Sequence, residues 1–400
     1  MRYFKDNIDA ILIILIFSLN ILRYLFNFYG TNSFIYSIYI LCIYFLFRRY
    51  SKNVFSIINK QVGIRNIFIL SILIISYAIL SISWNTSFEA VQYILKYLIT
   101  TIIACLCLAM PINKINIILN GIIFLNILYG ILLITNPFKV NSYISGDTNY
   151  LNMTISLGLS LSITLVRCLQ SLFIFNGKKV LIYGLLSIFS FLVLIMFAAR
   201  GVLLFPFIIS VILIPFFDNK KLFKSVLIIS VLCAIAVFAL SFYLSHANEY
   251  IANRFLSLFS NTSEESRVSI WIRSIDMIQE ESMYIFGGGV GSMVYPHNMF
   301  IQYIGEYGFI GLVYLLVSAQ YILKLFFKSL KVVSDDLKPV LFGILAGLLY
   351  YFMTFNKSFT IYDIGSLQIM YTLSVALLLQ LIPLFKSDKL FNNYTSSKHS

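Results

Sequence analysis

Three residues in this sequence could together bind an anion and move a proton. Arg200 lies in Phe197-Ala198-Ala199-Arg200-Gly201, a tight break between two apolar runs, and Arg267 and His297 lie in the one long hydrophilic stretch. A guanidinium pairs with phosphate or carboxylate oxygens through two parallel hydrogen bonds. A neutral imidazole can take a proton from an attacking hydroxyl group. These residue types predict an anion-binding site with a general base beside it.

Each of these residues also has a structural interpretation. An arginine near hydrocarbon is costly unless it faces a partner or a wet cavity, or reaches the membrane surface along its own stem. Arg200 could be a loop arginine that reaches the membrane surface in this way. It could also be an anion-binding group, with Gly201 allowing a ligand to approach the backbone. A lone histidine such as the one in Pro296-His297-Asn298 is more often structural than catalytic.

The hydrophilic stretch contains a predicted amphipathic helix. Thr262-Ser263-Glu264-Glu265 fits a capping box, and the glycines from residue 287 end the segment. The apolar residues between them recur at helical spacing and form one stripe: Val268, Trp271, Ile272, Ile275 and Ile278. Such a helix is expected to lie in the membrane interface. Arg267 falls at the edge of this stripe, which favours it for a site, whereas Arg273 falls opposite, with Asp276 and Glu280.

The glycine-rich run Gly287-Gly288-Gly289-Val290-Gly291 resembles a phosphate loop in composition only. It lacks the strand-loop-helix context and the Lys-Ser/Thr pair that such loops require, so a hinge before the next helix is the simpler interpretation. No metal-ligand cluster occurs in the long stretch, where His246 and His297 are far apart. We predict neither a metal ion nor a cofactor.

The composition predicts the class of fold that positions these residues. Sixty per cent of the 400 residues are hydrophobic, 11% are charged and the mean hydropathy is +0.90, whereas a soluble chain carries about 25% charged residues. A membrane span needs about 20 apolar residues. We therefore predict an all-α, polytopic membrane protein in a single transmembrane domain, residues 1–400. The expected spans lie near 9–28, 33–47, 67–84, 90–110, 115–135, 150–166, 180–197, 202–217, 222–244, 299–323, 339–356 and 365–385.

The basic residues predict the orientation. With both termini cytoplasmic, 21 of the 29 Lys and Arg fall in cytoplasmic segments, as membrane insertion favours. Residues 245–298 then form an external, periplasmic loop. The net charge of +13 is spread over short clusters between apolar runs, which argues against nucleic acid as a partner. The five cysteines lie in or beside apolar runs and indicate packing, not a disulfide framework.

The order of several short motifs resembles the bacterial O-antigen ligase and O-antigen polymerase family (Wzy-like and WaaL-like membrane glycosyltransferases). The matching pieces run through the middle of the chain, residues 145–320. They are Gly146-Asp147-Thr148-Asn149, Ala199-Arg200-Gly201, Ser266-Arg267, Trp271, Phe286-Gly287-Gly288-Gly289-Val290-Gly291, His297-Asn298 and Gly308-Phe309-Ile310-Gly311. Two positions depart from the family pattern: Ala199 stands where the family often has Ser, and Thr148 where it often has Pro.

The resemblance implies an architecture, a substrate and residue roles. It implies a GT-C-like membrane enzyme that acts on undecaprenyl-pyrophosphate-linked oligosaccharide within the membrane lipid of the bacterial inner membrane. Arg200 and Arg267 would contact the pyrophosphate and His297 would act as base. Substrate-binding roles fall to Asp147, Asn149, Trp271, Arg273 and Asn298. A chain-length regulator and a flippase are candidate protein partners.

The motifs leave three functional alternatives open. The leading interpretation is an O-antigen or capsular polysaccharide repeat-unit polymerase that is metal-independent and inverting. The second is a ligase that moves finished glycan to lipid A core. The third, of another class, is a polysaccharide transporter or flippase, although transporters usually carry ionisable residues near the midplane. Here Lys96 and Glu306 are the main residues of that kind.

Overall fold

The protein is all-helical in the part that the structure describes. This computed structural model describes residues 2–18, 21, 32–84, 88–135, 150–174, 176–196, 200–217, 266–293, 296–358 and 365–382. No strand occurs in these ranges. The helices are α1 (Arg2–Phe17), α3 (Asn32–Lys60), α4 (Val62–Ser81), α5 (Phe88–Cys107), α6 (Ile112–Thr135), α8 (Tyr150–Phe173), α9 (Gly177–Met196), α10 (Arg200–Leu213), the short 3-10 turn η1 (Ile214–Phe216), α13 (Ser266–Glu280), α14 (Met283–Phe286), α15 (Met299–Leu330), α16 (Lys338–Ser358) and α17 (Gly365–Leu381).

Length and composition make this chain a multi-pass membrane protein. Seven of the described helices are long and apolar enough to cross a membrane, namely α4, α5, α6, α8, α9, α15 and α16. Shorter apolar helices occur at Val202–Phe216 and Gly365–Leu381. The predicted all-α, polytopic fold class is confirmed. The predicted span at 222–244 lies outside the described residues, as do the capping box at 262–265 and Cys233.

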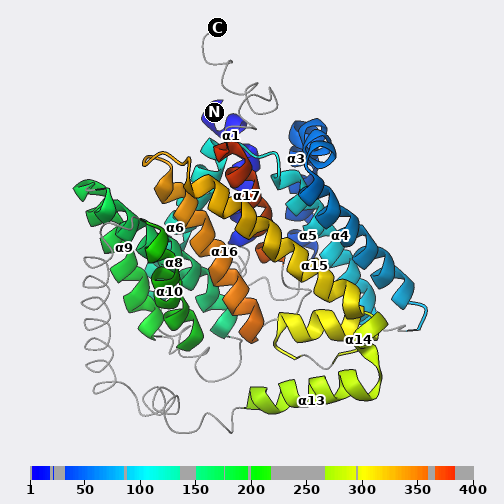
Figure 1. The fold of residues 1–400 in the computed structure, drawn as a ribbon. Coiled ribbons are helices and arrows are strands. Elements are labelled where there is room, and N and C mark those ends of the chain that lie inside the picture. Colours follow the sequence, from blue (N-terminus) through cyan, green and yellow to red (C-terminus); the bar gives the residue numbers. More distant parts are fainter. Residues whose placement is uncertain are drawn as a thin grey trace.

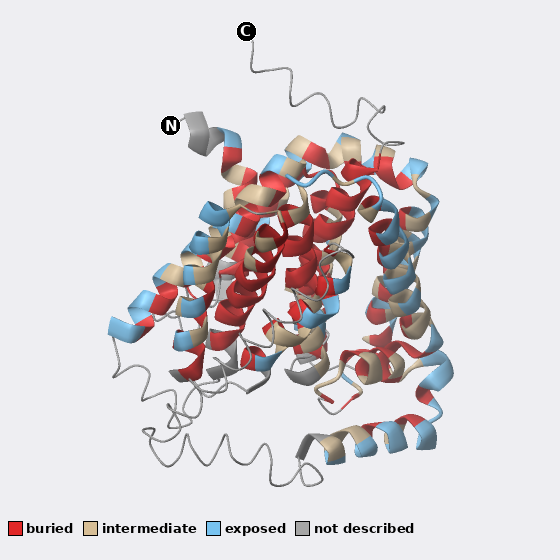
Figure 2. Cartoon of the chain, turned by 60° about the vertical axis from the view of Figure 1, so that its left-hand side comes forward, coloured by how far each residue is buried: buried red, intermediate tan, exposed pale blue. Residues whose placement is uncertain are grey.

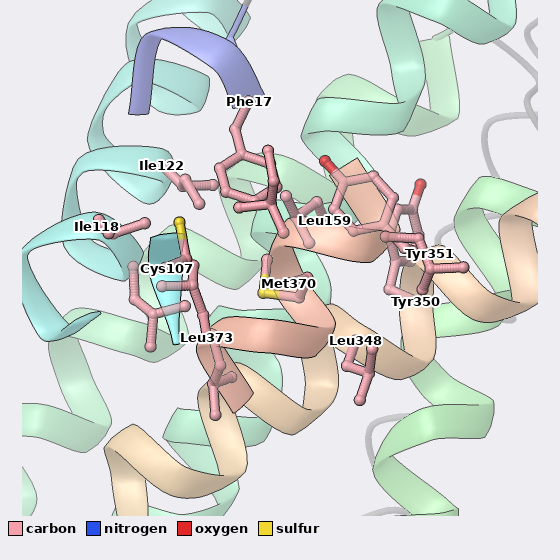
Figure 3. Packing of buried hydrophobic residues seen from close by; sticks show 14 of the residues in the cluster. Phe17, Cys107, Ile118, Ile122, Leu159, Leu348, Tyr350, Tyr351, Met370 and Leu373 are labelled. Atoms are coloured by element: carbon pink, nitrogen blue, oxygen red, sulfur yellow. The ribbon is translucent and has the colours of Figure 1, made fainter. Parts of the chain in front are cut away.

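The helices form a bundle with a buried centre and an exposed periphery (Figures 1 and 2). Of the span windows of α8 and α16, 83% and 78% of residues are buried, against 22% for α4 and 17% for α15. Side chains from α1, α6, α8, α16 and α17 meet in the core, where the rings of Phe17 and Tyr351 stack at 5.9 Å (Figure 3). The outer helices expose isoleucine, leucine and phenylalanine side chains. Such a surface suits lipid on the outside and close packing inside.

Small residues allow the central helices to approach closely. A Cβ added at Gly158 of α8 would lie 2.2 Å from the Tyr350 hydroxyl oxygen of α16. Hydroxyl groups of α8 bond to the carbonyls of their own helix, as Ser162 does to Gly158 and Thr164 does to Ser160. Both features are typical of helix packing in membranes, where backbone contact replaces the hydrophobic effect.

The two ends of the bundle differ in structure. α13 and α14 lie across one end, and α1 begins at the opposite end (Figure 1). We call these the α13 end and the α1 end. α9 ends at the α13 end, so α10, which follows it in the chain, begins there. α15 begins at the same end. The first residue of α10 is Arg200, and α15 starts two residues after His297.

Candidate functional site

A glycine loop, residues 287–291, joins α14 to the segment that precedes α15. Three of its glycines have a positive φ: 76° at Gly287, 88° at Gly289 and 77° at Gly291. Residues with a Cβ rarely adopt this conformation. Space is limiting as well, because a Cβ at Gly287 would lie 2.3 Å from the Glu306 carbonyl oxygen. The glycines therefore permit a tight turn that lies against the α15 backbone.

Helix α4 holds one side of the glycine loop. Near the end of α4, the Tyr77 hydroxyl donates to the Gly287 carbonyl at 3.0 Å, and Val290 N–H donates to the Ser81 hydroxyl at 3.1 Å. Just beyond the helix, Trp84 Nε1 donates to the Gly288 carbonyl at 3.2 Å. The sequence predicts a hinge here, whereas the structure shows a loop bonded to two helices.

Helix α15 holds the other side of the loop, and it is broken where it does so. Gly308 has φ 59° and ψ −143°, so the helix is interrupted there. An unbroken helix would pair the carbonyls of residues 305 and 306 with N–H groups four residues later. Here Gly288 N–H donates to the Gly305 carbonyl at 2.7 Å and Gly289 N–H to the Glu306 carbonyl at 3.1 Å. The loop thus satisfies backbone groups at the break in α15.

The Glu306 side chain is part of the same arrangement. It is fully buried and accepts hydrogen bonds from the Gln302 side-chain amide at 2.8 Å and from the Gly291 backbone N–H. The sequence marks Glu306 only as an unusual charge within an apolar run. Its partner Gly291 is fifteen positions earlier in the chain, and no local pattern indicates that contact.

His297 and Asn298 form the turn into α15. His297 is half-buried and has φ 51°, an uncommon value for a residue with a side chain. Asn298 is the N-cap of α15, and its side-chain oxygen accepts from Phe300 N–H at 2.9 Å and from Ile301 N–H at 3.2 Å. Capping explains the asparagine on structural grounds. Asn298 is predicted to bind substrate. Because capping uses its side-chain oxygen, its side-chain NH₂ is the group that could bind a ligand.

The apolar stripe predicted for α13 divides between two environments. Ile278 packs with Met283 and Met293 against α15, and Trp271 is half-buried. Ile272 and Ile275 are exposed, as a helix at a membrane surface requires. The structure describes the backbone of Arg267 but not its side chain.

The other predicted site residues are placed as follows. Arg273, Asp276 and Glu280 are all exposed on α13, as the helical spacing predicts. The backbone of Arg200 begins α10 at the α13 end, and its side chain is not described. Asp147 and Asn149 lie outside the described residues. The starts of α10, α13 and α15, which carry Arg200, Arg267 and His297, therefore share the α13 end with the glycine loop.

An apolar cavity of about 370 Å³ runs between α4, α5, α15, α16 and α17. Met299 and Tyr303 line it near the start of α15, and Ile64 and Leu108 line it nearer the α1 end. Several of its polar wall groups bond within the protein, whereas the Ser318 Oγ and the Tyr321 hydroxyl make no hydrogen bond to any described residue. The Tyr303 and Tyr97 hydroxyls lie 3.1 Å apart, the Tyr371 hydroxyl donates to the Ser318 carbonyl at 2.9 Å, and Gln368 donates to Thr101 at 3.3 Å. The cavity therefore presents mainly hydrocarbon.

The comparisons with known proteins agree with this geometry. No curated protein matches the chain. The family model described as O-antigen ligase matches residues 185–316, which include α10, α13, the glycine loop, His297 and the break at Gly308. This match supports an O-antigen ligase/polymerase-like family for the region that builds the α13 end, and members of that family are glycosyltransferase-like enzymes.

Proposed function

We propose that this protein is a repeat-unit polymerase for O-antigen or capsular polysaccharide. It transfers a glycan from a polyprenyl-pyrophosphate donor to the non-reducing-end sugar of an acceptor repeat unit. The observation that carries the proposal is that the helix starts bearing Arg200, Arg267 and His297 lie at one end of the bundle, within the region matched to the family. In a displacement reaction with an anionic leaving group, the two arginines would stabilise the leaving group and the histidine would act as the base, so the three must lie close together.

The reaction follows from the residue chemistry. His297 takes the proton from an acceptor hydroxyl group as its oxygen forms a bond to the anomeric carbon of the donor sugar. The bond from that carbon to the pyrophosphate oxygen breaks, and its electron pair stays on the pyrophosphate. Arg200 and Arg267 stabilise the charge that develops there through bidentate hydrogen bonds. Attack opposite the leaving group inverts the anomeric configuration and needs no metal ion.

Further polar groups would bind the glycan. The exposed Arg273 and the Asn298 amide can bond to sugar hydroxyl groups. The Trp271 indole nitrogen is buried and makes no hydrogen bond to any described residue, so a sugar oxygen could accept from it. Asp147 and Asn149 complete the proposed set.

The membrane setting supports a lipid-linked donor. The distribution of Lys and Arg favours cytoplasmic termini, and with that orientation the α13 end would face the outer side of the inner membrane. The exposed Ile272 and Ile275 suit the outer membrane surface. The hydrocarbon-walled cavity reaches Met299, two residues from His297. An isoprenoid chain could occupy it while the pyrophosphate stays at the membrane surface.

The test is a glycan profile of cells that carry single substitutions. Arg267→Ala should abolish long-chain glycan on a gel and leave single repeat units. Glu280→Gln, at an exposed position of the same helix with no proposed role, is the matched control and should leave chain length unchanged. Wild-type chain lengths in the Arg267→Ala strain would overturn the site assignment.

A ligase is the second candidate, because the matching family model is described as O-antigen ligase. Deleting the gene separates the two functions. Core carrying one repeat unit means that a polymerase was lost. Core carrying no glycan means that a ligase was lost.

A further inference from the structure

The side-chain carboxyl group of Glu306 accepts hydrogen bonds from two groups of the protein. It is fully buried in α15, two residues before the helix break at Gly308. Gln302, one turn earlier, donates its side-chain NH₂ to Oε1 at 2.8 Å, and Gly291 donates its backbone N–H to the carboxylate. A carboxylate has only acceptor sites, so it fits both donors at once.

Glu306 contacts the glycine loop through its backbone as well. Its carbonyl oxygen accepts from Gly289 N–H at 3.1 Å. The backbone bond holds the middle of the loop, and the side-chain bond holds its last residue, Gly291. Tyr77, Ser81 and Trp84 of the α4 region hold the opposite side. Glu306 on one side and Tyr77, Ser81 and Trp84 on the other therefore form a clamp that holds the glycine loop, and Glu306 is its acidic member.

The loop sets the position of the residues on either side of it. Before it, α14 connects to α13, which carries Arg267. After it, five residues separate Gly291 from His297. Two anion-binding or proton-accepting positions thus depend on where the loop lies. A misplacement of about 1 Å can cost a reaction roughly 100-fold in rate.

We propose that Glu306 is a positioning residue for glycan transfer: by accepting from both Gln302 and Gly291, its carboxylate fixes the glycine loop and with it the relative placement of α13 and His297. The inference rests on the proposed transferase function. It assigns Glu306 no contact with the substrate and no proton transfer.

The kinetic test exchanges the two side chains. Glu306→Gln places an NH₂ group against one of the two donors, so kcat should fall at least tenfold while the donor KM stays within about threefold. The double variant Gln302→Glu/Glu306→Gln restores every bond. In it, the new amide at position 306 donates its NH₂ to the new carboxylate at position 302, and the amide oxygen accepts from Gly291. The kcat of this variant should return to within about threefold of wild type.

The matched control for both variants is Ser329→Ala. Ser329 is buried in the same helix, and its hydroxyl donates to the Phe326 carbonyl at 2.9 Å, far along α15 from the glycine loop. Its removal should leave kcat and KM at their wild-type values.

A second readout is independent of activity. The chain has two tryptophans, so a Trp271→Phe background leaves Trp84, which donates to the loop, as the single emitter. Glu306→Gln should red-shift Trp84 emission and increase its quenching by acrylamide, and the exchanged pair should reverse both changes. If transfer activity is absent from wild-type protein, the proposed function fails, and the fluorescence still tests the clamp.

Two outcomes would overturn the positioning role. In the first, Glu306→Gln keeps the wild-type kcat and the wild-type Trp84 emission. In the second, the exchanged pair restores the emission but not kcat, which would mean that Glu306 itself takes part in the chemistry.

Discussion

The two ends of the bundle differ in the conformation of the backbone. Near the α1 end, Arg167 is 1% exposed and bonds to the side chains of Asn116 and Asn120 and to the Pro339 carbonyl. At the same end, the buried Asp9 pairs with Lys114 at 3.1 Å and with Arg49 at 3.3 Å. Protein groups satisfy these charges, and the backbone there is regular.

At the α13 end the backbone itself is unusual. Every positive φ among the described residues falls between Ser282 and Gly308. Left-handed residues with side chains, here Ser282 and His297, cost free energy and persist where the surrounding structure determines them. At the α1 end, charged side chains with protein partners join the helices. At the α13 end, backbone in uncommon conformations shapes the candidate site.

The largest effect is expected from His297→Ala. Loss of a general base lowers kcat by about 10² to 10⁴-fold, while the thermal unfolding temperature of the purified protein should stay close to wild type. Transfer assays with lipid-linked donor in detergent measure the first quantity. His246→Ala is the control, since that histidine lies in the same predicted external loop. An unchanged kcat would make His297 a structural residue like those of the α1 end.

Gly308→Ala should come next, and it should act on folding. Residue 308 has φ 59°, and an added Cβ would lie 2.4 Å from the Ile285 carbonyl oxygen. A residue with a side chain pays about 1–3 kcal/mol to adopt such a sparsely populated backbone conformation, and the contact adds to that. We expect a lower unfolding temperature and loss of the loop contacts. Gly177→Ala, where an added Cβ meets nothing within 4 Å, should be neutral, and equal stability of the two variants would contradict the role of the break.

Arg167→Met tests the α1 end. The substitution removes the donor to the Asn116 and Asn120 side-chain oxygens and to the carbonyl of the buried Pro339, and a buried group left unsatisfied costs about 1–3 kcal/mol. Folded protein yield should fall, but the kcat of the molecules that fold should match wild type. A fall in kcat without a fall in stability would break the division between the two ends.

Trp84→Phe should have the smallest effect. It removes one hydrogen bond to the Gly288 carbonyl, worth about 0.5–1.5 kcal/mol, and leaves the bonds from Tyr77 and Ser81. We expect a few-fold lower kcat and a slightly lower unfolding temperature. Tyr284→Phe is the control, because the Tyr284 side chain is exposed on the adjacent α14. Equal effects of the two substitutions would show that the α4 side does not hold the loop.

The sequence by itself determined the helical class, the membrane setting, most span positions and the amphipathic helix at 266–280. These properties depend on apolar length and on 3.6-residue periodicity, which are local along the chain. The motifs that suggested the family also lie in one continuous region. Local patterns therefore sufficed to choose Arg200, Arg267 and His297 as candidates.

Only the tertiary structure decided what the glycine loop and the buried charges do. The contacts that hold the loop join residues more than 200 positions apart, as Tyr77 to Gly287 and Trp84 to Gly288. In the sequence Arg167 resembles an ordinary basic residue at a span end, yet it is buried among partners from α6 and α16. The physical reason is that a hydrogen bond depends on distance in space, and in a helical bundle the residues that meet are set by how the helices pack.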